Sequence, residues 1–85
     1  MDTNTVNSIT QALQSGEVNF EFTKQDGSTR AMTATLNEEV IGEAKQYAGE
    51  SYLTVYEADK SQWRNIRLDT IKRASNAENV FYAAL

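Results

Sequence analysis

Cysteine, histidine and proline are all absent from this sequence of 85 residues. Without cysteine and histidine, the chain cannot build a zinc ribbon, an iron–sulfur cluster, a thiol nucleophile or a Ser-His-Asp triad. A metal site would have to use oxygen ligands alone. The lack of cysteine also excludes disulfides and is compatible with a reducing compartment.

Long apolar runs are missing as well. The first fifteen residues are polar, with no basic start followed by an apolar stretch, so we expect no signal peptide. No segment approaches the length of a membrane-spanning helix. We therefore expect a cytoplasmic protein without a membrane partner.

The residues that are present are those of a folded domain. Apolar residues make up 40% and charged residues 24% of the chain, which is ordinary for a globular protein. A chain of this length has room for one core only, so we predict a single domain over residues 1–85.

Charge is divided unevenly along the chain. Residues 1–59 hold three basic and ten acidic side chains, whereas residues 60–85 hold five basic and two acidic ones. The net charge of −4 argues against bulk coating of DNA, because neutralising phosphates needs a basic footprint. The division leaves room for a local basic site.

The first fifteen residues have the spacing of a helix. Val6, Ile9 and Leu13 form one stripe, which predicts an N-terminal helix within residues 1–16 that lies on a sheet. We expect Thr3 or Asn4 to cap its start and Gly16 to end it in the left-handed conformation.

Two hairpins follow, and residues 17–72 are predicted to form the β-rich body. In the first hairpin, a three-residue loop that ends at Gly27 keeps the apolar side chains on one face. That register predicts the pairs Val18–Ala34, Phe20–Met32 and Phe22–Arg30. In the second hairpin, we expect Tyr56 opposite Trp63 and Tyr52 opposite Arg67.

Two further helices are expected. One, over residues 38–48, lies between the hairpins, begins at the N-cap Asn37 and contains Gly42, which favours a short or irregular helix. The other is a short apolar helix within residues 73–85, because Ser75 and Glu78 have the spacing of a capping box. Ile71 can belong to a short strand before it.

The second hairpin carries the sharpest candidate site. Aromatic and basic side chains gather on one of its faces, and the candidate binding residues are Tyr52, Tyr56, Trp63 and Arg67, flanked by Lys60 and Lys72. Such a face suits protein docking, and it also suits single-stranded nucleic acid, whose bases stack on rings. An aromatic stripe is more often packed than exposed, however, so we expect a terminal helix to cover it.

Other charged residues have simpler explanations. Arg30, Arg64 and Arg67 can bind phosphate, but we expect them to pair with Glu21, Glu57 or Asp69. The acids Glu38, Glu39 and Glu43 are interpreted as a solvated helix face. No acid, serine or threonine has a base at a diagnostic spacing, so we predict no catalytic residues, no metal, no cofactor and no enzymatic activity.

Three short motifs carry a family resemblance. They are a KxDGxxR hairpin from Lys24 to Arg30, a TLN exit at residues 35–37, and a WRxxRLDxI ending from Trp63 to Ile71. Together they resemble the small bacteriophage WYL-type family with an Sm-like, SH3-like β-barrel fold. The resemblance implies a mainly β (α+β) fold, in which a bent antiparallel sheet closes into a small barrel, and a phage accessory protein.

These observations leave three hypotheses for function. The first is a non-catalytic phage protein that binds and modulates a host or phage macromolecular machine through protein–protein contact in the host cytoplasm. The second is binding of RNA or single-stranded DNA on the same aromatic face. The third is self-assembly into homo-oligomers through the edges of the sheet.

Overall fold

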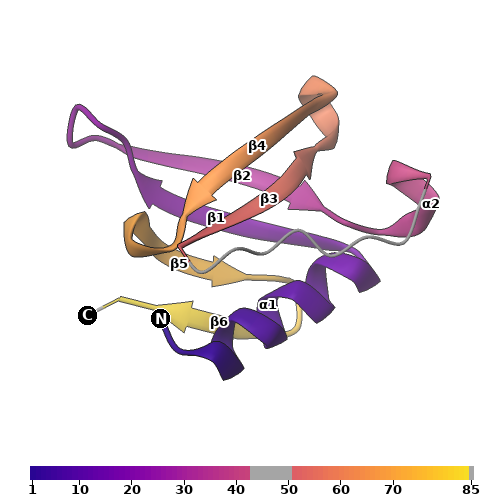
Figure 1. Cartoon of the computed structure of the whole chain (residues 1–85), viewed down its shortest axis with the longest axis horizontal. Helices are drawn as coiled ribbons and strands as arrows, with labels where there is room; N and C mark the ends of the chain where they lie inside the picture. Colours follow the sequence, from indigo (N-terminus) through magenta and orange to yellow (C-terminus); the bar gives the residue numbers. More distant parts are fainter. Residues whose placement is uncertain (43–50, 85) are drawn as a thin grey trace.

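The sheet and its helices are seen in a computed structural model, which describes residues 1–42 and 51–84. The sheet has six antiparallel strands in the order β4-β3-β2-β1-β5-β6, with helix α1 packed across it (Figure 1). The elements are α1 (Thr3–Ser15), β1 (Glu17–Thr23), β2 (Thr29–Thr35), α2 (Glu38–Ile41), β3 (Tyr52–Glu57), η1 (Ala58–Lys60), β4 (Gln62–Arg67), η2 (Leu68–Thr70), β5 (Ile71–Ser75) and β6 (Val80–Ala83).

The predicted N-terminal helix is confirmed, but its ends differ from the prediction. Asp2 rather than Thr3 or Asn4 caps it, because the Asp2 carboxylate accepts a hydrogen bond from the Thr5 N–H at 2.7 Å. This hydrogen bond lowers the pKa of Asp2. Gly16 has a φ of 170°, which is extended rather than left-handed backbone.

Both hairpin registers are confirmed. Gly27 has a φ of 88°, the left-handed conformation that the predicted loop requires. The observed pairs include Val18–Ala34, Phe20–Met32 and Phe22–Arg30 in the first hairpin, and Tyr52–Arg67 and Tyr56–Trp63 in the second.

The helix expected over residues 38–48 ends early. Gly42, with a φ of 83°, is its left-handed C-cap and donates its N–H to the Glu38 carbonyl. An L residue with a side chain rarely adopts this φ, so Gly42 stops the helix instead of lying within it. The rest of the expected range, residues 43–48, lies outside the described residues.

The prediction of a C-terminal helix is wrong, because β5 and β6 form a third hairpin there. Asn76 closes its turn: the side-chain oxygen accepts hydrogen bonds from the N–H groups of Glu78 and Asn79, at 2.9 and 2.8 Å. This turn uses the N–H groups that a helix start would leave free. Strand-forming residues then continue as β6.

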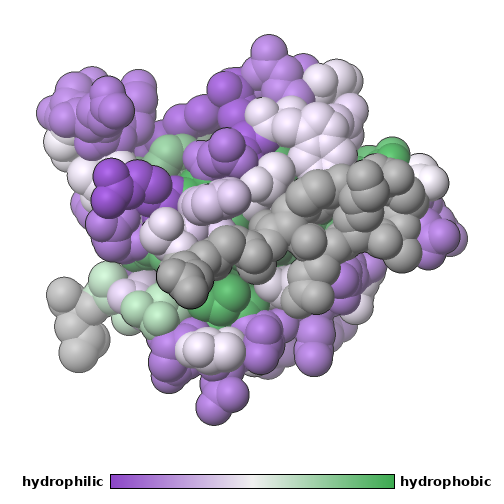
Figure 2. Space-filling view, viewed as in Figure 1, coloured by the Kyte–Doolittle hydropathy of each residue, from purple (hydrophilic) through white to green (hydrophobic). Residues whose placement is uncertain are grey.

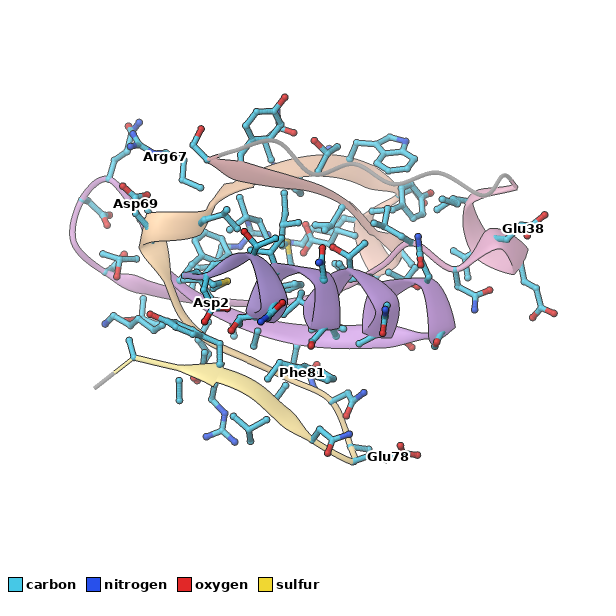
Figure 3. All side chains as sticks on the ribbon, turned by 60° about the horizontal axis from the view of Figure 1, so that its bottom comes forward. Asp2, Glu38, Arg67, Asp69, Glu78 and Phe81 are labelled. Atoms are coloured by element: carbon cyan, nitrogen blue, oxygen red, sulfur yellow. The ribbon has the colours of Figure 1, made fainter. Side chains whose placement is uncertain are left out.

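The core lies between α1 and one face of the sheet. Ile9 and Leu13 of α1 are fully buried against Phe20 and Leu53. Phe81 points from β6 toward α1 (Figure 3). The strand order places β4 and β6 at the two ends of the sheet. The pairings of the described strands thus show a six-stranded antiparallel sheet, and closure into a barrel stays a prediction.

Candidate binding surface on the second hairpin

The β3–β4 hairpin separates apolar from aromatic side chains by simple alternation. Leu53, Val55 and Ile66 point into the core and are buried. The opposite side of the hairpin, which we call the aromatic face, consists of Tyr52, Thr54, Tyr56, Trp63, Asn65 and Arg67. Because strand residues alternate between the two faces, packing of the core fixes what the other face presents.

Two aromatic side chains on this face are accessible to solvent. Tyr52 and Trp63 are each 44% exposed. Tyr56 is half-buried, and its ring lies 5.2 Å from that of Trp63 at an interplanar angle of 60°. The expectation that a terminal helix covers this face is therefore wrong, because α1 packs on the core side and the C-terminal segment forms strands.

Polar contacts order the rest of the aromatic face. The Thr54 hydroxyl donates to the Asn65 side-chain oxygen at 2.6 Å. Arg67 donates to Asp69 at 3.1 Å, and both side chains are largely exposed at one end of the sheet (Figure 3). The predicted pairing of Arg67 with Asp69 is thus confirmed.

The flanking lysines lie in different places. Lys60, in η1, reaches the Glu57 carboxylate at 3.9 Å and is about half exposed. Lys72 lies on β5, where its ammonium donates to the Thr29 hydroxyl at 2.9 Å. Because β5 pairs with β1 and β6 in the sheet, Lys72 does not share a strand pair with the aromatic face.

A buried carboxylate holds three of the cations. Glu57 is 3% exposed and accepts two hydrogen bonds from Arg30, both at 3.1 Å, and one from Arg64 at 3.0 Å. Burial alone raises the pKa of Glu57, but the Arg64 hydrogen bond and the charges of Arg30 and Lys60 outweigh burial and lower it. The carboxylate is therefore held ionised, and it ties β2 to the second hairpin.

This cluster changes what the basic residues can do. Arg30, Arg64 and Lys60 are directed at Glu57, and Arg67 is directed at Asp69. Cations with a carboxylate partner offer less charge to phosphate. The local basic site expected from residues 60–85 is therefore weaker than its formal charge indicates.

The sequence did not point to a cavity of about 530 Å³ beside β4. Phe22 and Ile66 are its apolar lining residues, and Lys24, Asp26 and Thr70 are among its polar ones. Arg67 lines it too, so the cavity adjoins the aromatic face. Alternation along the strands gave no signal for this site, because its lining comes from the β1–β2 turn and from β4, which are far apart in the sequence.

Most of the molecular face seen in Figure 2 is hydrophilic, with strongly hydrophobic residues showing only in small patches. Within residues 1–42 and 51–84, no three Asp or Glu side chains are grouped so as to hold a metal ion. No helix of the described part of the chain is both long and apolar enough to cross a bilayer.

An N-terminal helix on a six-stranded antiparallel sheet is compatible with the small β folds that the motifs imply. The family model described as "WYL_2, Sm-like SH3 beta-barrel fold" matches residues 6–72 of the chain. The chain therefore belongs to this family. No curated protein and no solved structure matches it significantly.

Proposed function

We propose that this protein is a non-catalytic accessory protein that docks on a protein partner through the aromatic face. The observation that carries the proposal is the exposure of Tyr52 and Trp63, each 44%, on one side of the β3–β4 hairpin. Tyrosine, tryptophan and arginine are the residue types that contribute most to binding energy in protein interfaces. A phage origin, and a host or phage machine as the partner, belong to the same proposal.

The aromatic face also supports a second candidate, binding of RNA or single-stranded DNA. Exposed rings on a sheet can stack against bases, with cations near the phosphates. The charges of the described residues favour a protein instead, since the nearest arginines already face Glu57 or Asp69. Protein docking needs rings and local hydrogen bonds more than it needs net positive charge.

The two candidates separate in an affinity capture from bacterial lysate with and without nuclease. We expect one protein to be retained in stoichiometric amount after nuclease treatment, and to be lost from the Trp63→Ala variant. Val80→Ala is the control, because Val80 is 54% exposed on β6, at the other end of the sheet from β4. Retention that disappears with nuclease, or affinity for oligonucleotides that falls steeply with salt, would support nucleic-acid binding and contradict protein docking.

A further inference from the structure

Within residues 1–42 and 51–84, strand β4 is paired on one side only, and the cavity of about 530 Å³ lies along it. End strands carry backbone N–H and C=O groups that point away from the sheet. The residues of β4 that line the cavity are Asn65, Ile66 and Arg67. A strand that is paired on both sides has no such backbone groups to offer beside a cavity, because its neighbours already bind them.

The hydrogen bonds of the hairpin show which residues of β4 direct their backbone outward. The Leu68 N–H donates to the Ser51 carbonyl at 2.9 Å. In an antiparallel pair, backbone groups alternate in direction from one residue to the next. The backbone N–H and C=O of Ile66 therefore point toward β3, while those of Asn65 and Arg67 point toward the outer edge of β4. The Arg67 carbonyl agrees with this direction, because it accepts from the Thr70 hydroxyl at 2.7 Å.

The walls of the cavity suit an uncharged chain better than an anion. Phe22 is half-buried and Ile66 is buried, so they give the cavity an apolar side. At its margin and in the adjoining hollow, Lys24 and Arg67 are balanced by Asp26 and Asp69. This balance offers no net positive charge to a phosphate, whereas an apolar side chain can pack on the two core residues.

We propose that the free edge of β4 binds an extended segment of a partner protein as an added strand. The segment pairs with the backbone of Asn65 and Arg67 and places one apolar side chain in the cavity against Phe22 and Ile66. The inference rests on the proposed protein-binding function, because Asn65 and Arg67 also belong to the aromatic face. The proposed binding site thus continues from the aromatic face onto the outer edge of β4.

The test uses nine-residue peptides selected from a random displayed library on the full chain. Asn65→Pro removes the outward N–H of Asn65, and proline is tolerated at such positions of edge strands. Asn65→Ala removes the side chain but keeps the N–H, so it is the matched control. We expect Asn65→Pro to bind the selected peptides at least about tenfold more weakly than Asn65→Ala does, because Asn65→Ala keeps the outward N–H and Asn65→Pro lacks it.

A second pair of variants keeps the proposal testable if Asn65→Pro does not fold. Gln25 is an exposed lining residue of the cavity, so Gln25→Trp should fill the entrance and weaken peptide binding. Gln11→Trp makes the same exchange on an exposed position of α1 and should have no effect. In the wild type, bound peptide should slow hydrogen exchange of the Asn65 and Arg67 N–H groups.

Several results would overturn edge binding. They are a library that yields no binding peptide, peptides that bind a folded Asn65→Pro or Gln25→Trp variant as tightly as the wild type, or peptides whose binding leaves exchange at Asn65 unchanged. Peptides that lose affinity only with Trp63→Ala would overturn edge binding while supporting the proposed docking face. Peptides whose affinity falls with Asn65→Pro but not with Trp63→Ala would support edge binding. The role of the rings would then be decided by the capture experiment.

Discussion

The first and second hairpins of the sheet are held in different ways. The first, β1–β2, has seven paired positions, and β5 pairs with the other side of β1. The second, β3–β4, is joined to β2 by the pair Thr35–Tyr56 and by the two hydrogen bonds that Arg30 of β2 donates to Glu57 of β3. The first hairpin therefore lies at the centre of the sheet, whereas the second contributes Leu53, Val55 and Ile66 to the core and also presents rings and the end strand β4 on its outer sides.

The largest expected effect comes from the core of the first hairpin. Phe20 is fully buried, so Phe20→Ala should lower the free energy of unfolding by about 3–5 kcal/mol through lost burial and the cavity left behind. Urea unfolding measures the change. A loss below about 1 kcal/mol would mean that the first hairpin does not hold the core as described.

Breaking the link between the hairpins should cost less. Glu57→Gln leaves Arg30 and Arg64 without their carboxylate, and we expect a loss of about 2–3 kcal/mol in the free energy of unfolding. Asp69→Asn is the control, because the Arg67–Asp69 pair is exposed and should contribute less than about 1 kcal/mol. Equal losses in the two variants would contradict the special role of Glu57.

The same link should weaken in acid. Since the folded-state pKa of Glu57 lies below its ordinary value of 4.5, the ionised carboxylate stabilises the fold above that value. The stabilisation is lost as pH falls below 4.5 and through the lowered folded-state pKa. The difference in unfolding free energy between the wild type and Glu57→Gln should therefore narrow over that range. A difference that widens in acid would contradict the assignment.

The smallest effect on stability is expected on the aromatic face. Tyr52→Ala removes a side chain that is 44% exposed, so the free energy of unfolding should fall by less than about 1 kcal/mol. Thermal unfolding of the variant measures this loss. A loss as large as that of Phe20→Ala would show that the ring serves the core rather than a partner.

Features of the fold that depend on residues close together in the sequence were the most predictable. Alternation and turn chemistry were enough for both hairpin registers, because moving the first register by one residue would expose its apolar face. The capping-box spacing of Ser75 and Glu78 predicted a helix that does not form. The Asn76 side chain accepts the Glu78 N–H, which a Ser75 cap would need, and also the Asn79 N–H. Local signals of this kind compete, and the strand-forming residues of β6 decided the outcome.

The candidate site was predictable only in part. The pairs of the aromatic face followed from register, and the pairing of Arg30 and Arg64 with Glu57 was among the expected alternatives. The burial of Glu57 and the cavity beside β4 were not predictable, because both depend on how the second hairpin lies against the first. That arrangement is set by packing between residues far apart in the chain.

Docking through the aromatic face is tested most directly by the dissociation constant of the complex between this protein and the purified protein that nuclease-treated capture retains. We expect the Tyr52→Ala/Trp63→Ala variant to bind that protein at least about thirtyfold more weakly than the wild type, the effect of losing an interface hot spot of about 2 kcal/mol. Val80→Ala, at the other end of the sheet, should bind as the wild type does. An unchanged dissociation constant for a folded Tyr52→Ala/Trp63→Ala variant would contradict docking through the aromatic face.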